Sequence, residues 1–137
     1  MAAVRYCPQA AQVPIHLARN RILLISGGEQ SGKSLSTAAE IVARYGAWRL
    51  CYLVGPTYTG AHKEFDYIVA MLQKIGAVTN SGISRPRNGK ATLRTRDGAT
   101  LETISSEDGT KSITGTGESP DVLAMVEAGK QSFDIYL

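Results

Sequence analysis

The residues most suited to chemistry lie between Gly27 and Ser34, where their types and spacing fit the pattern GxxxxGK[ST]. Glycines let the backbone curl around a phosphate so that its N–H groups point inward, and the helix that follows adds a partial positive charge. The lysine is expected to reach the β- and γ-phosphates, and the final serine to bind Mg²⁺ through its hydroxyl. The stretch therefore predicts an ATP-binding phosphate loop. Its residues are Gly27, Gly28, Glu29, Gln30, Ser31, Gly32, Lys33 and Ser34.

A second candidate is the acidic end of an apolar run, where Val122 to Met125 and Val126 lead to Glu127. A buried strand of this kind delivers a carboxylate to the carboxyl edge of a sheet, which is where a nucleotide site needs one. The usual form ends in Asp-Glu, but here Val126 occupies the position of the aspartate. Glu127 is therefore predicted either to orient the attacking water or to serve as the metal carboxylate itself.

Gln12 is a candidate adenine contact. Its amide both donates and accepts hydrogen bonds, as recognition of an adenine edge requires. The alternative is an ordinary surface glutamine. His16 and Pro14 are interpreted as structural.

These side chains need a particular set of elements to position them. Ile22 to Ile25 reads as a buried strand before the loop, and Arg49 to Gly55 as a second strand. Apolar residues recur at helical spacing after each, and Gly46 and Gly76 are the expected helix ends. The apolar positions are Leu35, Ala38, Ala39, Val42 and Tyr45 in the first helix, and Phe65, Ile68, Leu72 and Ile75 in the second. This alternation predicts an α/β fold with a mostly parallel sheet flanked by helices.

A loop is expected from Val78 to Lys90, followed by a β-hairpin insertion. Its arms are Ala91–Thr95 and Thr100–Ile104, joined through Asp97-Gly98. The region is the most basic of the chain, with cations at Arg85, Arg87, Lys90, Arg94 and Arg96. It could follow a phosphate backbone, or be a solvated face whose charges serve solubility, since no aromatic side chain interleaves them to stack on bases.

Length and composition set the class of protein. The 137 residues predict one domain, 1–137, and 43% hydrophobic with 20% charged residues is ordinary for a globular protein. No apolar run approaches the roughly 20 residues of a membrane span, and the N-terminus lacks a signal-peptide pattern. Cys7 and Cys51 fit neither a disulfide framework nor a metal site. These features predict an intracellular, cytoplasmic protein, whose net charge of +3 is compatible with nucleic acid.

Taken together, the motifs resemble the ATPase domain of the large terminase subunit of tailed bacteriophages, a DNA-packaging motor. Tyr6-x-Pro8-x-x-x-Gln12 looks like the adenine-side motif of that family, and GGEQSGKS like its phosphate loop. Val54-Gly55-Pro56-Thr57-Tyr58 followed by Glu64-Phe65 is similar to a strand and helix of the family. A glycine at 115 or 117 and the acidic strand ending in Glu-Ala complete the resemblance.

The resemblance implies a P-loop NTPase that binds ATP and Mg²⁺ and hydrolyses ATP to drive phage DNA packaging. The implied catalytic residues are Lys33 and Glu127, and the implied metal residues are Ser34 and Glu127. The implied partners are double-stranded DNA, the portal and the small terminase subunit, with a possible homo-oligomeric ring in the host cytoplasm. The chain departs from the family at Glu29-Gln30, where many members have arginine, and at Val126. It ends at Leu137, so we expect an incomplete ATPase domain without a nuclease domain.

Two other classes of function compete with this interpretation. One is another P-loop ATPase acting on nucleic acid, such as a helicase; a small-molecule kinase is a weaker possibility. The other is a catalytically idle remnant that binds nucleotide or only partner proteins. Phosphate release, and its dependence on Glu127, separates the idle module from the ATPases.

Overall fold

The computed structural model describes residues 7–17, 19, 23, 25, 32–106 and 119–127. Two helices of substantial length cross it, α2 (Lys33–Ala43) and α3 (His62–Lys74). The shorter helical segments are η1 (Ala10–Gln12), α1 (Val13–Leu17), η2 (Thr59–Ala61) and η3 (Asn80–Gly82). None of the helices in these ranges is long and apolar enough to cross a membrane.

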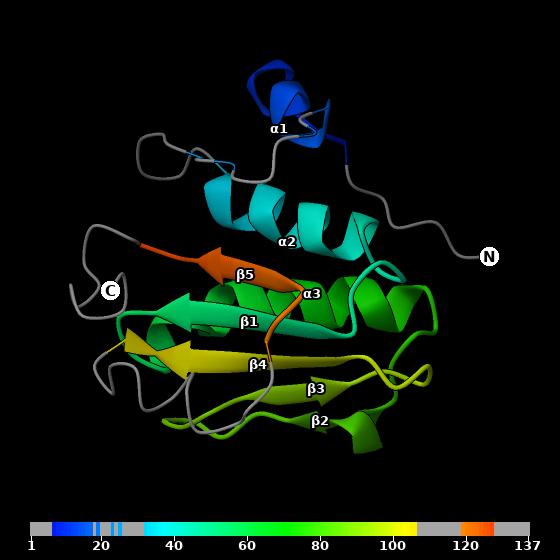
Figure 1. Ribbon diagram of the computed structural model, residues 1–137, viewed down its shortest axis with the longest axis vertical. Helices are drawn as coiled ribbons and strands as arrows, with labels where there is room; N and C mark the ends of the chain where they lie inside the picture. The colour runs from blue at the N-terminus through cyan, green and yellow to red at the C-terminus, as the bar shows by residue number, and fades with distance from the viewer. Residues whose placement is uncertain are drawn as a thin grey trace.

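The strands form one mixed sheet in the order β2-β3-β4-β1-β5 (Figure 1). They are β1 (Leu50–Gly55), β2 (Ile83–Ser84), β3 (Thr92–Arg94), β4 (Thr100–Ser105) and β5 (Val122–Met125). β1 pairs in parallel with both β4 and β5, whereas β3 pairs antiparallel with β2 and β4. The central position of β1 explains its nearly continuous apolar sequence, since a strand between parallel neighbours is buried on both faces.

The strand register directs alternate side chains of β1 to opposite faces. Cys51 lies beside Leu101 of β4 and Val122 of β5, on the face that the helices cover. Tyr52 and Val54 point to the other face, where they pack with Ile104. The period of two along the strand therefore separates two apolar clusters.

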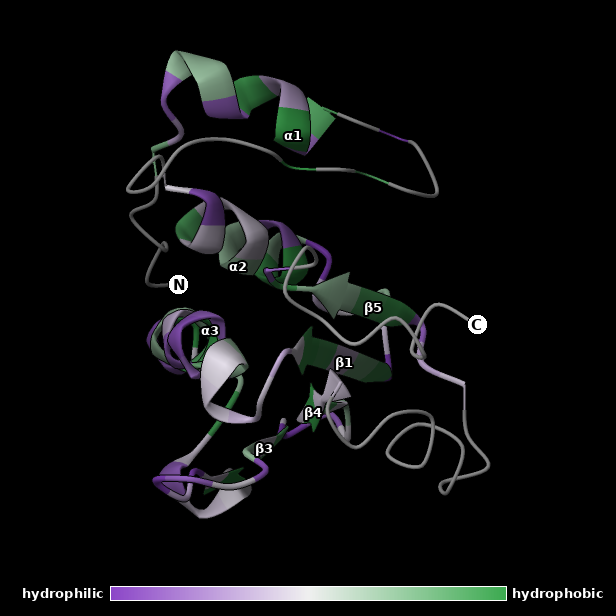
Figure 2. Cartoon of the chain, turned by 90° about the vertical axis from the view of Figure 1, so that its left-hand side faces the viewer, coloured by the Kyte–Doolittle hydropathy of each residue, from purple (hydrophilic) through white to green (hydrophobic). Residues whose placement is uncertain are grey.

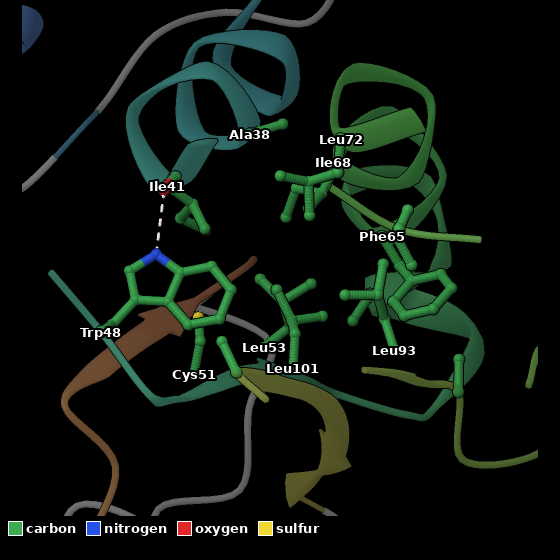
Figure 3. Close-up of a cluster of buried hydrophobic side chains, with 14 of the residues drawn as sticks. Ala38, Ile41, Trp48, Cys51, Leu53, Phe65, Ile68, Leu72, Leu93 and Leu101 are labelled. Atoms are coloured by element: carbon green, nitrogen blue, oxygen red, sulfur yellow. Dashed lines mark hydrogen bonds between the residues drawn. The ribbon is translucent and has the colours of Figure 1, made fainter. Parts of the chain in front are cut away.

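The larger cluster lies between the sheet and the helices α2 and α3, which cover the same face (Figure 2). Side chains from both helices meet those of the strands there (Figure 3). Trp48, only 2% exposed, closes one end and donates from Nε1 to the carbonyl of Ile41 at 3.0 Å. This bond joins the end of α2 to the start of β1 and satisfies one of the carbonyls that a helix end leaves unpaired.

The described residues confirm much of the predicted order. Both helices form, and Gly46 and Gly76 follow them with φ of +98° and +72°, the left-handed conformation expected at a helix end. The hairpin also forms, but its second arm is β4, a central strand of the sheet rather than part of an appendage. The sheet is accordingly mixed rather than mostly parallel.

Two expectations need separate comment. The stretch from Val78 to Lys90 was expected to be a loop only, whereas it contains η3 and the edge strand β2. Of the strand expected at Ile22–Ile25, only residues 23 and 25 belong to the described part of the chain, and neither is assigned to a strand. The rest of that prediction lies outside the described residues.

Candidate functional site

The first turn of α2 lies at the carboxyl edge of the parallel strands. The end of α2 is held near the start of β1 by the bond from Trp48 to Ile41, so its first turn lies toward the end of β1. Its 11 residues span about 16 Å, close to the length of a six-residue strand. Lys33 and Ser34 thus begin the helix at the edge where β1 and β5 end (Figure 1).

Gly32 precedes this turn and has a backbone that suits glycine. Its φ is +79°, and it caps the helix without a side chain. A Cβ at this position would lie 2.5 Å from Nε2 of Gln12, so a larger residue would collide with that side chain. The left-handed conformation favours glycine here, and a larger residue would also require the end of the Gln12 side chain to shift.

Gln12 therefore lies beside Gly32 of the predicted phosphate loop, although Gly32 is 20 positions later in the sequence. Its side chain is 8% exposed, and Nε2 donates to the carbonyl of Gly32 at 3.5 Å. Its Oε1 accepts from the backbone N–H of Gln9 at 2.8 Å. The amide thus ties the N-terminal segment to the start of α2, and contact with adenine stays a prediction.

Glu127 follows β5 at the same edge of the sheet. The backbone N–H of Val126 donates to the carbonyl of Val54 at 2.8 Å, which extends the pairing with β1 as far as this residue. Glu127 is exposed and has φ of +51°, an uncommon conformation for a residue with a Cβ. Strained positions of this kind concentrate at functional sites.

Val126 is 8% exposed and belongs to the apolar cluster beneath the helices. It follows Val122 and Ala124 on the helix-facing side of β5, as the period of two requires. The position where an aspartate was expected therefore holds an apolar side chain that packs in the core.

The structure thus places five of the predicted site residues at the same edge of the sheet. Gln12 and Gly32 are in contact, Lys33 and Ser34 begin α2, and Glu127 follows β5 at the same edge. The predicted residues Gly27 to Ser31, Gly115, Gly117 and Ala128 lie outside the described residues. Ser34 and Glu127 are groups that could hold Mg²⁺, and Lys33 could neutralise phosphate charge.

One residue at this edge was not predicted as a site from its own chemistry. Glu64, in the first turn of α3, is 4% exposed, and no donor among the described residues reaches its Oε2. The sequence held a signal, because Glu64, Ile68, Met71 and Ile75 follow an apolar spacing in which only the first residue is charged. A buried carboxylate oxygen without a donor is expected where its partner is a bound cation or another group that is not part of the protein.

A separate polar cluster links α1 to α2. His16 Nδ1 lies 2.7 Å from Oε2 of Glu40, and Arg44 Nε donates to Oε1 of the same carboxylate at 2.6 Å. A groove of about 540 Å³ opens beside it, lined in part by Pro8 and Arg19. This arrangement supports the structural interpretation of His16.

Another groove lies at the opposite, amino edge of the sheet. It has a volume of about 680 Å³ and is lined by Arg49, Arg94, Thr100 and Asp121 among others. The starts of β1, β4 and β5 surround it, so it is remote from Lys33. We therefore do not assign it to the nucleotide.

The basic region is partly neutralised by carboxylates. Arg85 binds Asp66 through Nε and Nη2 at 2.7 and 2.9 Å, and Lys90 lies 2.9 Å from Glu102. These pairs favour the solvated-face interpretation for two of its cations. The interpretation that this region contacts a phosphate backbone therefore depends on its other cations.

The two cysteines differ in burial. Burial raises the pKa of the Cys51 thiol to about 12, so this side chain stays protonated and unreactive. Cys7 is exposed. Within the described ranges no three His, Cys, Asp or Glu residues form a metal-binding group.

Comparison with known proteins identifies the fold. No family model and no curated protein matches the sequence. Among solved structures, the ATPase domain of the large terminase of Thermus phage P74-26 aligns over 96% of this chain with a TM-score of 0.71 and 21% identity. An arginine-to-alanine variant of the same domain aligns with the same TM-score and identity. The chain therefore has the fold of a phage large terminase ATPase domain, and it spans 57% of the length of that chain.

Proposed function

We propose that this chain is the nucleotide-binding part of a terminase-like ATPase that drives the packaging of phage DNA. The observation that supports the proposal is that α2 begins with Lys33 and Ser34, and Glu127 follows β5, at the same carboxyl edge of a sheet with the terminase fold. Ligands of open α/β sheets bind in the crevice outside the carboxyl ends of the strands.

Each residue has a distinct part in this proposal. Lys33 and the backbone of the loop from Gly27 bind the phosphates, and Gln12 contacts the adenine. Ser34 binds Mg²⁺, which when bound neutralises the charge that develops on the phosphates. Glu127 holds the attacking water and accepts its proton. Phosphoryl transfer depends mainly on positioning and charge neutralisation, which these groups can supply.

The proposal also concerns the binding partners of the chain and its location in the cell. Double-stranded DNA, the portal and the small terminase subunit are proposed partners, in a homo-oligomeric ring within the host cytoplasm. The exposed arginines near the β3–β4 hairpin are the proposed DNA contact, because the sequence has a net charge of +3 and its cations concentrate there.

A second candidate is a module that binds nucleotide without turnover. The burial of Val126 in the core favours it, because a motor is expected to have a metal carboxylate at that position. The two candidates share nucleotide binding and differ in phosphate release.

The experiment that tests the proposal is calorimetry of Mg²⁺-ATP binding, followed by a phosphate-release assay on the same samples. We expect Lys33→Ala to weaken binding by about 1.5–3 kcal/mol, roughly 10- to 150-fold, as loss of charged hydrogen bonds predicts. Lys74→Ala, an exposed lysine in the last turn of α3, is the matched control and should bind as the wild type does. Binding without phosphate release would select the idle module, and no binding by the folded chain would reject both.

A further inference from the structure

Glu64 is an unusual residue for a protein interior. Its side chain lies in the first turn of α3, is 4% exposed, and has an Oε2 that no donor in the described part of the chain reaches. A buried carboxylate oxygen without a partner is costly, because it loses its hydration and gains no hydrogen bond in return. A bound cation or hydrogen-bond donor would satisfy such an oxygen.

The direction of Glu64 follows from its neighbours on α3. His62 Nε2 lies 3.0 Å from the carbonyl of Gly89, and Asp66 pairs with Arg85, so this flank faces the β2–β3 segment. Successive helical residues are about 100° apart, which places Glu64 on the opposite flank, about 200° from His62. That flank faces α2.

Ile68 supports this placement. It lies one turn after Glu64 on the same side of the helix, and Figure 3 shows it between α2 and α3. Glu64 is therefore one turn nearer to the carboxyl edge, on the side of α3 that packs against α2. The first turn of α2 contains Lys33 and Ser34.

At this edge the helix-facing side of β5 has no carboxylate at the position next to Glu127, where an aspartate was expected. Val126 faces the helices from β5 and is buried in the core. The helix-facing side of β5 thus presents an apolar side chain here, whereas α3 contains a buried carboxylate whose Oε2 has no donor in the described part of the chain.

We infer that Glu64 is the metal-side carboxylate of the nucleotide site, acting with Ser34 to hold the divalent cation, directly or through a bound water. The inference rests on the proposed nucleotide binding and names a residue that the proposal does not. Carboxylate and hydroxyl oxygens are the ligands that Mg²⁺ prefers.

The test compares nucleotide affinity with and without Mg²⁺ in the whole chain. We expect Mg²⁺ to strengthen ATP binding to the wild type. In Glu64→Gln, the affinity of Mg²⁺ for the complex of the protein with ATP should be about 10- to 100-fold lower. Affinity for ATP in the absence of Mg²⁺ should change little. Electron paramagnetic resonance of Mn²⁺ with ATP gives a second readout that needs no turnover. Asp66→Asn, an exposed carboxylate on the same helix, is the matched control and should leave both readouts unchanged.

A rescue variant separates a metal role from a structural one. Val126→Asp introduces a carboxylate on the helix-facing side of β5, so it should restore Mg²⁺ dependence in the Glu64→Gln background. Glu64→Met, which removes the orphaned charge, should unfold at the same temperature as the wild type or higher when no ligand is present. A marked loss of stability in Glu64→Met would show that the carboxylate is structural and overturn the inference.

The remaining outcomes distinguish the two proposals. Unchanged Mg²⁺ dependence in Glu64→Gln, with ATP still bound, would overturn the inference alone. No ATP binding by the wild-type chain would overturn the proposed function and this inference with it.

Discussion

Gly32 is the residue at which backbone conformation and side-chain packing are most closely linked. Its φ is +79°, and a Cβ would lie 2.5 Å from Nε2 of Gln12. We expect Gly32→Ala to lower the free energy of unfolding by about 1–3 kcal/mol, the range for a strained left-handed residue. It should also weaken ATP binding, because it displaces Gln12 and the start of α2. Urea denaturation and calorimetry measure the two effects.

Gly46 provides the control, because it has φ of +98° but no atom within 4 Å of the Cβ position. Gly46→Ala should reduce stability through backbone strain and leave ATP affinity unchanged. Adding Gln12→Ala removes the collision, so the double variant with Gly32→Ala should lose less stability than the sum of the single variants. Equal loss of ATP affinity in Gly46→Ala and Gly32→Ala would contradict the role assigned to the contact.

Glu127 combines a strained backbone with an exposed carboxylate at the end of β5. If it accepts a proton from the attacking water, Glu127→Gln should reduce phosphate release by roughly 10²- to 10⁴-fold and preserve ATP binding. Glu127→Gly should lose turnover equally, yet unfold at the same temperature as Glu127→Gln or higher, since glycine adopts positive φ without strain. Full phosphate release by Glu127→Gln would exclude this residue from the chemistry.

At the scale of elements, Asp121 joins the starts of two neighbouring strands. Its Oδ2 accepts from the backbone N–H groups of Arg49 and Leu50, at 2.7 and 3.1 Å. These two bonds lower the pKa of the carboxyl below its ordinary value of 3.8. The negative form is therefore favoured in the folded chain and fixes where β5 begins beside β1.

The lowered pKa has a definite consequence for stability. A depressed carboxyl pKa stabilises the folded state above pH 3.8, and the contribution is lost as the pH falls through the lower folded value. Asp121→Asn should therefore be less stable than the wild type at neutral pH, with the difference shrinking below pH 3.8. Thermal unfolding between neutral and acid pH measures this, and a constant difference across the range would contradict it.

The elements also show what the sequence could predict. Hydrophobic periodicity predicted α2 from the apolar stripe of Leu35 to Tyr45 and β1 from the apolar run at Arg49 to Gly55. Burial on one or both faces of an element produces such a pattern, which is visible in the sequence alone. The two-residue strand β2 was missed, since it depends on pairing with β3 and not on its own pattern. The central place of β4 was missed for the same reason.

The candidate site also has a part that the sequence predicted and a part that it did not. Lys33 and Ser34 followed from a local motif, whose residues are adjacent in sequence. The contact of Gln12 with Gly32 and the burial of Glu64 depend on packing between segments far apart in the chain. The sequence alone does not show which side chains this packing buries. The carboxylate oxygen of Glu64 without a donor could therefore be recognised only in the folded structure.

For the whole molecule, the decisive feature is that the site is assembled from separate segments. Gln12 comes from the N-terminal segment, Lys33 and Ser34 from α2, and Glu127 from the end of β5. A nucleotide bound among them would link these segments in the folded state only. Binding that is exclusive to the folded state must raise its stability.

Mg²⁺-ATP at 100 times its dissociation constant should therefore stabilise the chain by about 2.7 kcal/mol. For a domain of this size, that corresponds to a rise in unfolding temperature of roughly 5 to 15 °C. Lys33→Ala should keep only about 0.3–1.4 kcal/mol of this stabilisation at the same concentration, because its affinity is expected to be roughly 10- to 150-fold weaker, whereas Lys74→Ala should show all of it. Differential scanning calorimetry with and without nucleotide makes the comparison. An equal shift in wild type and Lys33→Ala would place the nucleotide elsewhere on the protein, because only a site that uses Lys33 makes the stabilisation depend on this side chain.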